Sequence, residues 1–329
     1  MIAETRTAST GVAGFQADFT AFWRGIPDKA LFFGLFAAWA ALFHFLGNST
    51  LGYTKTDSLF GWLNYCYHAN SDDAHGLIMP LVVLVLFWCK RDQLLAVPKR
   101  HWWLAISLLV VALLLHVAGF AIQQTRVSVM AFFLGLYALM GLIWGRAWLK
   151  VSFFPFFLFV FCLPLSTVAE PITRPLRLVA TSITSAVCHL VLGVDVLHEG
   201  NRIFNPNGAY QYEVAAACSG IRSLTAIFAL TTIYGFMAFK STWRTWLIIL
   251  SAFPLAVAAN VLRLISIIIA SEVFDPAAGK FVHENEWISL LPYLPAFLGV
   301  ILLGHWLRED KARPKAVEAA VIPNATHTI

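Results

Sequence analysis

The chain has 329 residues, of which 59% are hydrophobic and only 12% are charged, and its mean hydropathy is +0.72. Soluble domains carry roughly 25% charged residues, so the composition excludes an ordinary soluble globular protein. The formal charge of +5 would indicate nucleic-acid binding only if the basic residues clustered on one soluble face. They lie instead in short segments between apolar runs, and we expect no nucleic-acid partner.

Eight apolar runs predict an all-α polytopic membrane protein, because about 20 apolar residues cross a bilayer as one helix. We read the first run as a retained helix, since it starts late and no small-residue cleavage pattern follows it. Residues 1–25 and 309–329 are expected to be flexible cytoplasmic ends of one transmembrane domain, 26–308. In chain order the predicted spans are Ala30–Gly47, Leu77–Cys89, Trp102–Ile122, Val127–Trp144, Val151–Leu165, Ile221–Phe239, Trp246–Ala270 and Trp287–Leu307.

The basic residues set the expected orientation of these spans. With both termini in the cytoplasm, 15 of the 23 Lys and Arg residues fall in inside segments and six in outside segments. Four of them, Lys90, Arg91, Lys99 and Arg100, share one inside loop. Cytoplasmic loops of membrane proteins carry an excess of Lys and Arg, so this orientation is favoured.

The outer segment before the sixth span contains two recognisable elements. Residues 176–192 (LRLVATSITSAVCHLVL) have helical spacing with interspersed Ser and Thr, which predicts a small helix lying on or dipping into the outer leaflet. Residues 194–214 then alternate around Asn207-Gly208, a strong turn signal. This pattern predicts a β-hairpin that leads directly into the block EVAAACSGIRSL, residues 213–224.

Three outer helix ends bring together residues that suit cysteine chemistry. Cys218 precedes the sixth span, and a helix N-terminus or a nearby cation lowers a thiol pKa. Arg263 lies in the seventh span with Asn260 three residues before it on the same face, and an intramembrane arginine is expected to be functional. His283 comes just before the eighth span, where it could accept or return a proton. The pattern predicts a cysteine nucleophile, with Arg263 stabilising an oxyanion.

Each of these residues also has a structural interpretation. Cys218 could be a small buried hydrophobe, His283 an ordinary loop histidine, and Arg263 a structural partner of Glu272 or Asp275. At the level of function, the chain could be a non-catalytic scaffold or polysaccharide-export component. It could also be a serine-type intramembrane protease that uses Ser219 instead of the preceding cysteine, although a cysteine is the better nucleophile at neutral pH.

No cofactor or metal is expected from the sequence. No two cysteines form a CxxC pair, and the run from His283 to Glu286 lacks the second histidine of a zinc helix. The neighbours Cys188 and His189 point to different faces of their helix, so they do not form a catalytic pair.

The blocks EVAAACSGIRSL, ANVLRL and FVHE resemble the three signature blocks of the exosortase/archaeosortase family. The segment before Cys218 and the stretch DAHGLIMPLVVLVLFWCKR, residues 73–91, are similar to this family as well. The resemblance covers roughly residues 70–305.

The resemblance implies a multispanning bacterial inner-membrane enzyme that acts at the outer face as a cysteine peptidase or transpeptidase. Its implied partners are exported proteins with a tripartite C-terminal tag, namely a PEP-like motif, a hydrophobic helix and a basic end. Cys218 would be the nucleophile, Arg263 the stabilising residue and His283 the acid/base, with Arg222 in a supporting role. His75 matches a recurring His-Gly block without an assigned role. The acceptor nucleophile stays open between water, a lipid and a sugar amine, and membrane lipids surround the enzyme.

Overall fold

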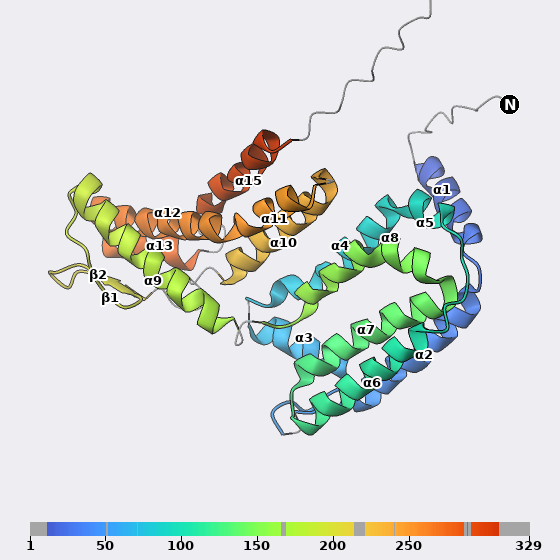
Figure 1. The fold of residues 1–329 in the computed structure, drawn as a ribbon. Coiled ribbons are helices and arrows are strands. Elements are labelled where there is room, and N and C mark those ends of the chain that lie inside the picture. The colour runs from blue at the N-terminus through green and yellow to red at the C-terminus, as the bar shows by residue number, and fades with distance from the viewer. Residues whose placement is uncertain are drawn as a thin grey trace, which may run out of the picture.

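The computed structural model describes residues 12–50, 52–70, 72–165, 169–213, 221–239, 241–285, 288 and 291–308. Apolar helices dominate it, as the composition predicts (Figure 1). Four of them are long and apolar enough to cross a membrane by length and composition, within the described ranges: Lys29–Leu46, Thr125–Trp144, Pro171–Leu192 and Thr242–Val273. Shorter apolar helices cover Met79–Cys89, Ala105–Ala121, Leu224–Ala238 and Leu291–Trp306.

The first half of the chain forms a helical bundle. Helices α2, α6 and α7 run side by side in it (Figure 1). Its elements are α1 (Val12–Gly25), α2 (Lys29–Leu46), α3 (Leu59–Ala69), the 3-10 turn η1 (Ala74–Leu77), α4 (Met79–Cys89), α5 (Arg91–Ala96), α6 (Ala105–Ala121), α7 (Thr125–Trp144), α8 (Arg146–Phe157) and the 3-10 turn η2 (Leu158–Cys162).

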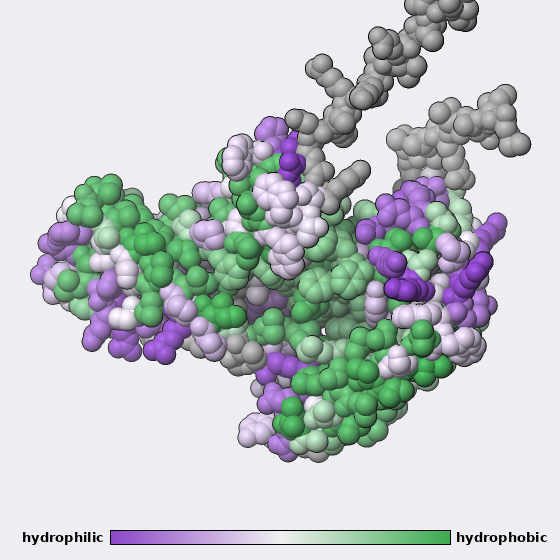
Figure 2. Space-filling view, in the orientation of Figure 1, coloured by the Kyte–Doolittle hydropathy of each residue, from purple (hydrophilic) through white to green (hydrophobic). Residues whose placement is uncertain are grey.

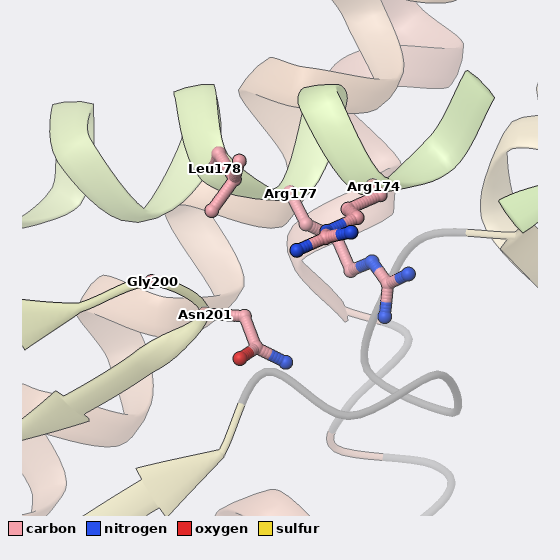
Figure 3. Close-up of a pocket in the computed structure, with 5 residues that line it drawn as sticks. All are labelled: Arg174, Arg177, Leu178, Gly200 and Asn201. Carbon is pink, nitrogen blue, oxygen red and sulfur yellow. The ribbon is translucent and has the colours of Figure 1, made fainter. Parts of the chain in front are cut away.

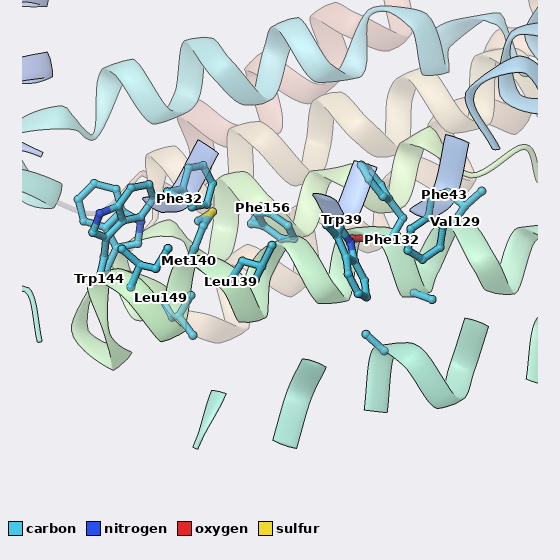
Figure 4. Close-up of a cluster of buried hydrophobic side chains, with 14 of the residues drawn as sticks. Phe32, Trp39, Phe43, Val129, Phe132, Leu139, Met140, Trp144, Leu149 and Phe156 are labelled. Carbon is cyan, nitrogen blue, oxygen red and sulfur yellow. The ribbon is translucent and has the colours of Figure 1, made fainter. Parts of the chain in front are cut away.

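Aromatic side chains fill the core of this bundle (Figure 4). The indole nitrogen of Trp39 in α2 donates a hydrogen bond to the carbonyl of Phe132 in α7 at 3.0 Å. Gly145 separates α7 from α8 with a φ of +91°, and a side chain there would meet the backbone carbonyl of Arg100. Only glycine fits both conditions, so the chain can reverse direction between α7 and α8.

The second half contains the candidate site. Here α9 lies beside α12, and the strands lie at one end of both helices (Figure 1). Its elements are α9 (Glu170–Val187) with a following π-helical turn η3 (Cys188–Leu192), β1 (Leu197–Glu199), β2 (Arg202–Phe204), β3 (Gln211–Glu213), α10 (Ile221–Ala238), α11 (Thr242–Leu250), α12 (Ala252–Val273), α13 (Pro276–Glu284), the 3-10 turn η5 (Leu291–Tyr293) and α15 (Leu294–Trp306).

The observed sheet has three strands, one more than the predicted hairpin. β1, β2 and β3 form an antiparallel sheet in that order, with Glu199 opposite Arg202 and Phe204 opposite Gln211. Gly208, in the predicted turn between β2 and β3, has a φ of +73°. The additional hairpin between β1 and β2 turns at Gly200, whose φ is +60°, so both turns depend on a left-handed glycine.

Several boundaries differ from the sequence prediction. The segment expected as a flexible N-terminus contains helix α1, which is held to α5 by the ion pair of Asp18 and Arg91 at 3.4 Å. The predicted span Val151–Leu165 is divided between α8 and η2. The predicted span Trp246–Ala270 is divided between α11 and α12 at Ser251.

Helix α9 begins six residues before the predicted small helix, at Glu170, and has an inverted amphipathic pattern. Thr173, Arg177, Thr181 and Thr184 are buried against the protein, whereas Ile172, Val179 and Ile183 on other faces are 57%, 49% and 41% exposed. Water would select the opposite arrangement. Apolar side chains that face outward and polar ones that face inward indicate a helix in contact with lipid.

Candidate functional site

The structure describes part of the predicted site. Cys218 and Ser219 lie outside the described residues, and so does the side chain of Arg222 at the start of α10. Asn260, Arg263 and His283 are described: Asn260 and Arg263 lie in the middle of α12, and His283 lies in the last turn of α13.

Arg263 and His283 contact each other, as the sequence predicts. Arg263 is buried on α12 with 8% of its surface exposed, and its Nη2 donates to the backbone carbonyl of His283 at 3.4 Å. The Arg263 Nε is buried and has no hydrogen-bond partner among the residues that the structure describes. A guanidinium has five N–H donors, so this arginine keeps hydrogen-bonding capacity beyond its bond to His283.

Asn260 extends the polar face of α12. It lies three residues before Arg263, is 3% exposed, and its Oδ1 has no hydrogen-bond partner in the described ranges. Buried polar atoms are usually hydrogen-bonded. This face of α12 therefore carries two buried polar groups, one turn apart, that have no hydrogen-bond partner among the described residues.

The alternative partners predicted for Arg263 are occupied elsewhere. Glu272 accepts hydrogen bonds from the Tyr210 hydroxyl at 2.7 Å and from the Asn205 amide at 2.9 Å. Asp275 caps the next helix by accepting from the backbone nitrogen of Ala278 at 2.6 Å. Neither carboxylate forms an ion pair with Arg263 in the described structure, so the structural interpretation of this arginine loses its predicted partners.

His283 lies on a helix rather than in a loop. Asp275 is the N-cap of α13 and Pro276 is at its first position, a combination that favours helix initiation. Gly279 allows α13 to approach α12, because a side chain there would meet the Ser271 hydroxyl and the backbone carbonyl of Ile267. The cap and the glycine together fix His283 against α12.

Tyr212 is a further contact of His283 that the sequence prediction did not include. The two rings lie edge to face with their centroids 5.8 Å apart. The Tyr212 hydroxyl contacts the Ser271 hydroxyl at 2.8 Å and donates to the Pro276 carbonyl at 3.3 Å. The alternation of Tyr210 and Tyr212 could have indicated that both side chains share one face of the strand, and their rings stack with centroids 5.4 Å apart.

The environment of His283 favours its neutral imidazole. Burial lowers the pKa of His283 first of all, the positive charge of Arg263 lowers it further, and the negative charge of Glu284 opposes both. A neutral imidazole can accept a proton from a thiol. The site therefore contains a base that is ready at neutral pH beside a cation that can stabilise negative charge.

His75 is not brought to this site by any described contact. Its Nδ1 lies 2.9 Å from the Asp72 carbonyl in its own loop. The rejected pair also stays apart, since Cys188 is fully buried and the exposed His189 pairs with Asp195 at 3.0 Å. Within the described ranges, no group of three His, Cys, Asp or Glu side chains could hold a metal ion.

Comparison with known proteins identifies the family. Comparison with curated proteins and with solved structures found no match. The family model described as transmembrane exosortase matches residues 62–307, which is most of the chain and includes every predicted site residue. This multi-helical membrane protein therefore belongs to the transmembrane exosortase family.

Proposed function

We propose that the protein is a cysteine peptidase or transpeptidase that cleaves C-terminal sorting signals of exported proteins at the outer face of the bacterial inner membrane. Cys218 is its nucleophile, His283 its general acid/base and Arg263 its oxyanion-stabilising residue. The observation that carries the proposal is the bond from Arg263 Nη2 to the His283 carbonyl. It joins two residues that the sequence predicts to be catalytic and that lie on different helices.

Chain connectivity supports the assignment of Cys218. Tyr212, whose ring contacts His283, precedes Cys218 by six residues in the sequence. Six residues of polypeptide span at most about 20 Å, so the nucleophile and the histidine are tethered to one region. Arg222 follows the cysteine by four residues, and we assign it a supporting role.

The proposed reaction has two steps. The Cys218 thiolate, formed by proton transfer to His283, attacks the scissile carbonyl carbon, and Arg263 stabilises the oxyanion. The C–N bond breaks, the imidazolium protonates the departing amine, and a thioester to the enzyme remains. An acceptor nucleophile (water, a lipid or a sugar amine) then attacks the thioester, and the proton that it loses returns to the sulfur as the thiol is released.

The environment of the site suits a membrane-anchored substrate. The predicted tag combines a short PEP-like motif with a hydrophobic helix and a basic end, so the helix can enter laterally from lipid. The apolar outward side chains of α9, next to α12, support such an approach.

The test is processing of an exported reporter with such a tag. We expect anchored precursor to accumulate in Cys218→Ala, Arg263→Ala and His283→Ala at normal membrane expression, with processing reduced more than about 100-fold. Matched controls remove the same residue types elsewhere, at exposed Cys89, Arg146 and His305, and should process as the wild type.

Two further variants decide the identity of the nucleophile. If Cys218→Ser stays active while Ser219→Ala is inactive, the nucleophile is the serine and the cysteine mechanism is wrong. Wild-type processing by Cys218→Ala would instead favour a scaffold without catalytic activity.

A further inference from the structure

A small cavity lies between α9 and the turn that joins β1 to β2. Its volume is about 110 Å³, enough to hold several waters or a small anion. Figure 3 shows two arginines of α9 on one side of the cavity and the turn on the other. The lining residues are Arg174, Arg177, Leu178, Gly200 and Asn201.

The lining of this cavity is electropositive. Arg174 and Arg177 lie one turn apart in the first half of α9, and both carry a positive charge at neutral pH. Asn201 offers an amide from the opposite side, and none of the five described lining residues is acidic. Two guanidinium groups around a small cavity suit a tetrahedral or planar oxyanion, because their N–H donors can bind its oxygens in pairs.

One arginine of the cavity is buried, which distinguishes the cavity from a basic patch on the surface. Arg177 is only 5% exposed, so its guanidinium is held within the protein beside the cavity. Thr173, one turn earlier on the same face, is 1% exposed, and its hydroxyl has no hydrogen-bond partner within the described ranges. Thr173 is not among the described lining residues, but it belongs to the same buried polar face of α9 as Arg177.

The surroundings of the cavity identify the source of the anion. Leu178 lines the cavity and is 38% exposed on the outer surface of α9. Val179 and Ile183 continue this apolar surface, which Figure 2 shows as a hydrophobic face over α9. A ligand with a phosphate in the cavity and acyl chains along this face would satisfy both surfaces, and basic pockets beside membrane helices bind lipid headgroups.

We propose that Arg174, Arg177 and Asn201 form a phosphate-binding site for an anionic phospholipid headgroup, with the acyl chains lying along α9. Neither Arg263 nor His283 is among the described lining residues, and the proposal does not depend on the catalytic assignment. It places a bound lipid against the sheet whose last strand carries Tyr212.

The test measures thermal stabilisation of the purified, delipidated full-length protein in an uncharged detergent. The probes are dioctanoyl-phosphatidylglycerol, dioctanoylglycerol, which lacks the phosphate, and inorganic phosphate. We expect saturable stabilisation by phosphatidylglycerol, none by dioctanoylglycerol, and weak competition by inorganic phosphate. Arg174→Gln should raise the apparent Kd several-fold, and Arg177→Gln about 10-fold or more.

Matched variants keep the test decisive. Arg146→Gln removes an exposed arginine at the start of α8 and should bind as the wild type. Since Arg177→Gln could fail to fold, Arg174→Gln on the exposed side and Arg177→Lys, which keeps the charge, provide the readout. Equal affinity for inorganic phosphate would assign the site to a free anion and overturn the lipid. Unchanged binding in Arg174→Gln, and in Arg177→Gln where it folds, would overturn the site itself.

Discussion

The hydroxyl of Tyr212 lets one side chain hold three elements together. It bonds to Ser271 on α12 and to Pro276 at the start of α13, while its ring contacts His283. In the proposed mechanism these contacts would hold the imidazole of His283 in place. We therefore regard Tyr212 as a positioning residue.

Tyr212→Phe keeps the ring contact and removes both hydrogen bonds. We expect a loss of about 1 kcal/mol of stability and a several-fold lower kcat at unchanged KM, because the imidazole is held less firmly. Steady-state kinetics on a tagged peptide in detergent measures kcat and KM separately. The matched control is Tyr210→Phe, which loses its bond to Glu272 and should keep the wild-type kcat. Equal losses of kcat in both variants would contradict the positioning role.

Glu284 is the neighbour that raises the pKa of His283, so its removal has a predictable sign. In Glu284→Gln the imidazolium loses a favourable negative charge, and the pKa of His283 falls further below its ordinary value. NMR titration of labelled histidine in a Cys218→Ala background measures this without coupling to the thiol. Lys280→Gln, which alters the exposed partner of Glu284 at 3.8 Å, is the control. A pKa of His283 that rises in Glu284→Gln would refute the electrostatic account.

For individual residues, the sequence predicted which side chains belong to the candidate site better than it predicted the elements and contacts around them. Arg263 and His283 were predicted from helix ends and chemistry, and their contact is confirmed. The prediction of His283 in a loop was wrong, because the Asp275-Pro276 cap starts a helix in a segment too short and too polar to show a helical period. Tyr212 was missed because a contact between a strand and a helix depends on tertiary packing.

Helices α12 and α13 depend on Gly279 for their close approach. A methyl group there would meet the hydroxyls of Ser271 and Tyr212 and the Ile267 carbonyl, so Gly279→Ala must push α13 away from α12. We expect a loss of about 1–3 kcal/mol from overpacking and a large loss of activity, since His283 moves with α13. Gly34→Ala in α2, where a methyl meets nothing within 4 Å, is the control. Thermal unfolding and reporter processing measure both effects, and full activity in Gly279→Ala would contradict this role of the glycine.

The sequence identified the regions around α9 and the sheet but not their full extent. Ser and Thr within residues 176–192 favoured a surface helix, because polar side chains of a helix are usually expected to face water. In α9 they face the protein and the apolar side chains face outward. β1 was missed because three residues that are all exposed give no alternation between buried and exposed positions. The Asn-Gly turn was found because its signal is local.

Across the whole molecule, polar and apolar surfaces are separated. Figure 2 shows hydrophilic side chains over α1 and α5 at one end and around β1 and β2 at the other, with hydrophobic faces over α6 and α9. This distribution suits a protein whose two ends face water on opposite sides of a bilayer. The predicted orientation places the sheet outside and α5 inside.

Helix α9 decides the topology, because its length would also allow it to cross. Its start follows Pro164, whose carbonyl accepts from Arg126 at the beginning of α7, on the predicted outer side. Its end, at Cys188, packs with Leu264 and Ile268 of α12. Ile268 lies five residues before the end of α12, about 8 Å along the helix. Both ends of α9 therefore lie near the outer surface, and we predict that α9 does not cross.

Labelling of single cysteines with a membrane-impermeant maleimide tests this in a chain whose native cysteines are replaced by alanine. Pro171→Cys and Glu199→Cys, at exposed positions before and after the body of α9, should both react from the outside of intact spheroplasts. Asp92→Cys in α5 should react only after permeabilisation, because α5 lies on the inner side. If Pro171→Cys and Glu199→Cys react from opposite sides, α9 spans the membrane. The termini would then lie on opposite sides of the bilayer, because one additional crossing changes an even number of spans to an odd one.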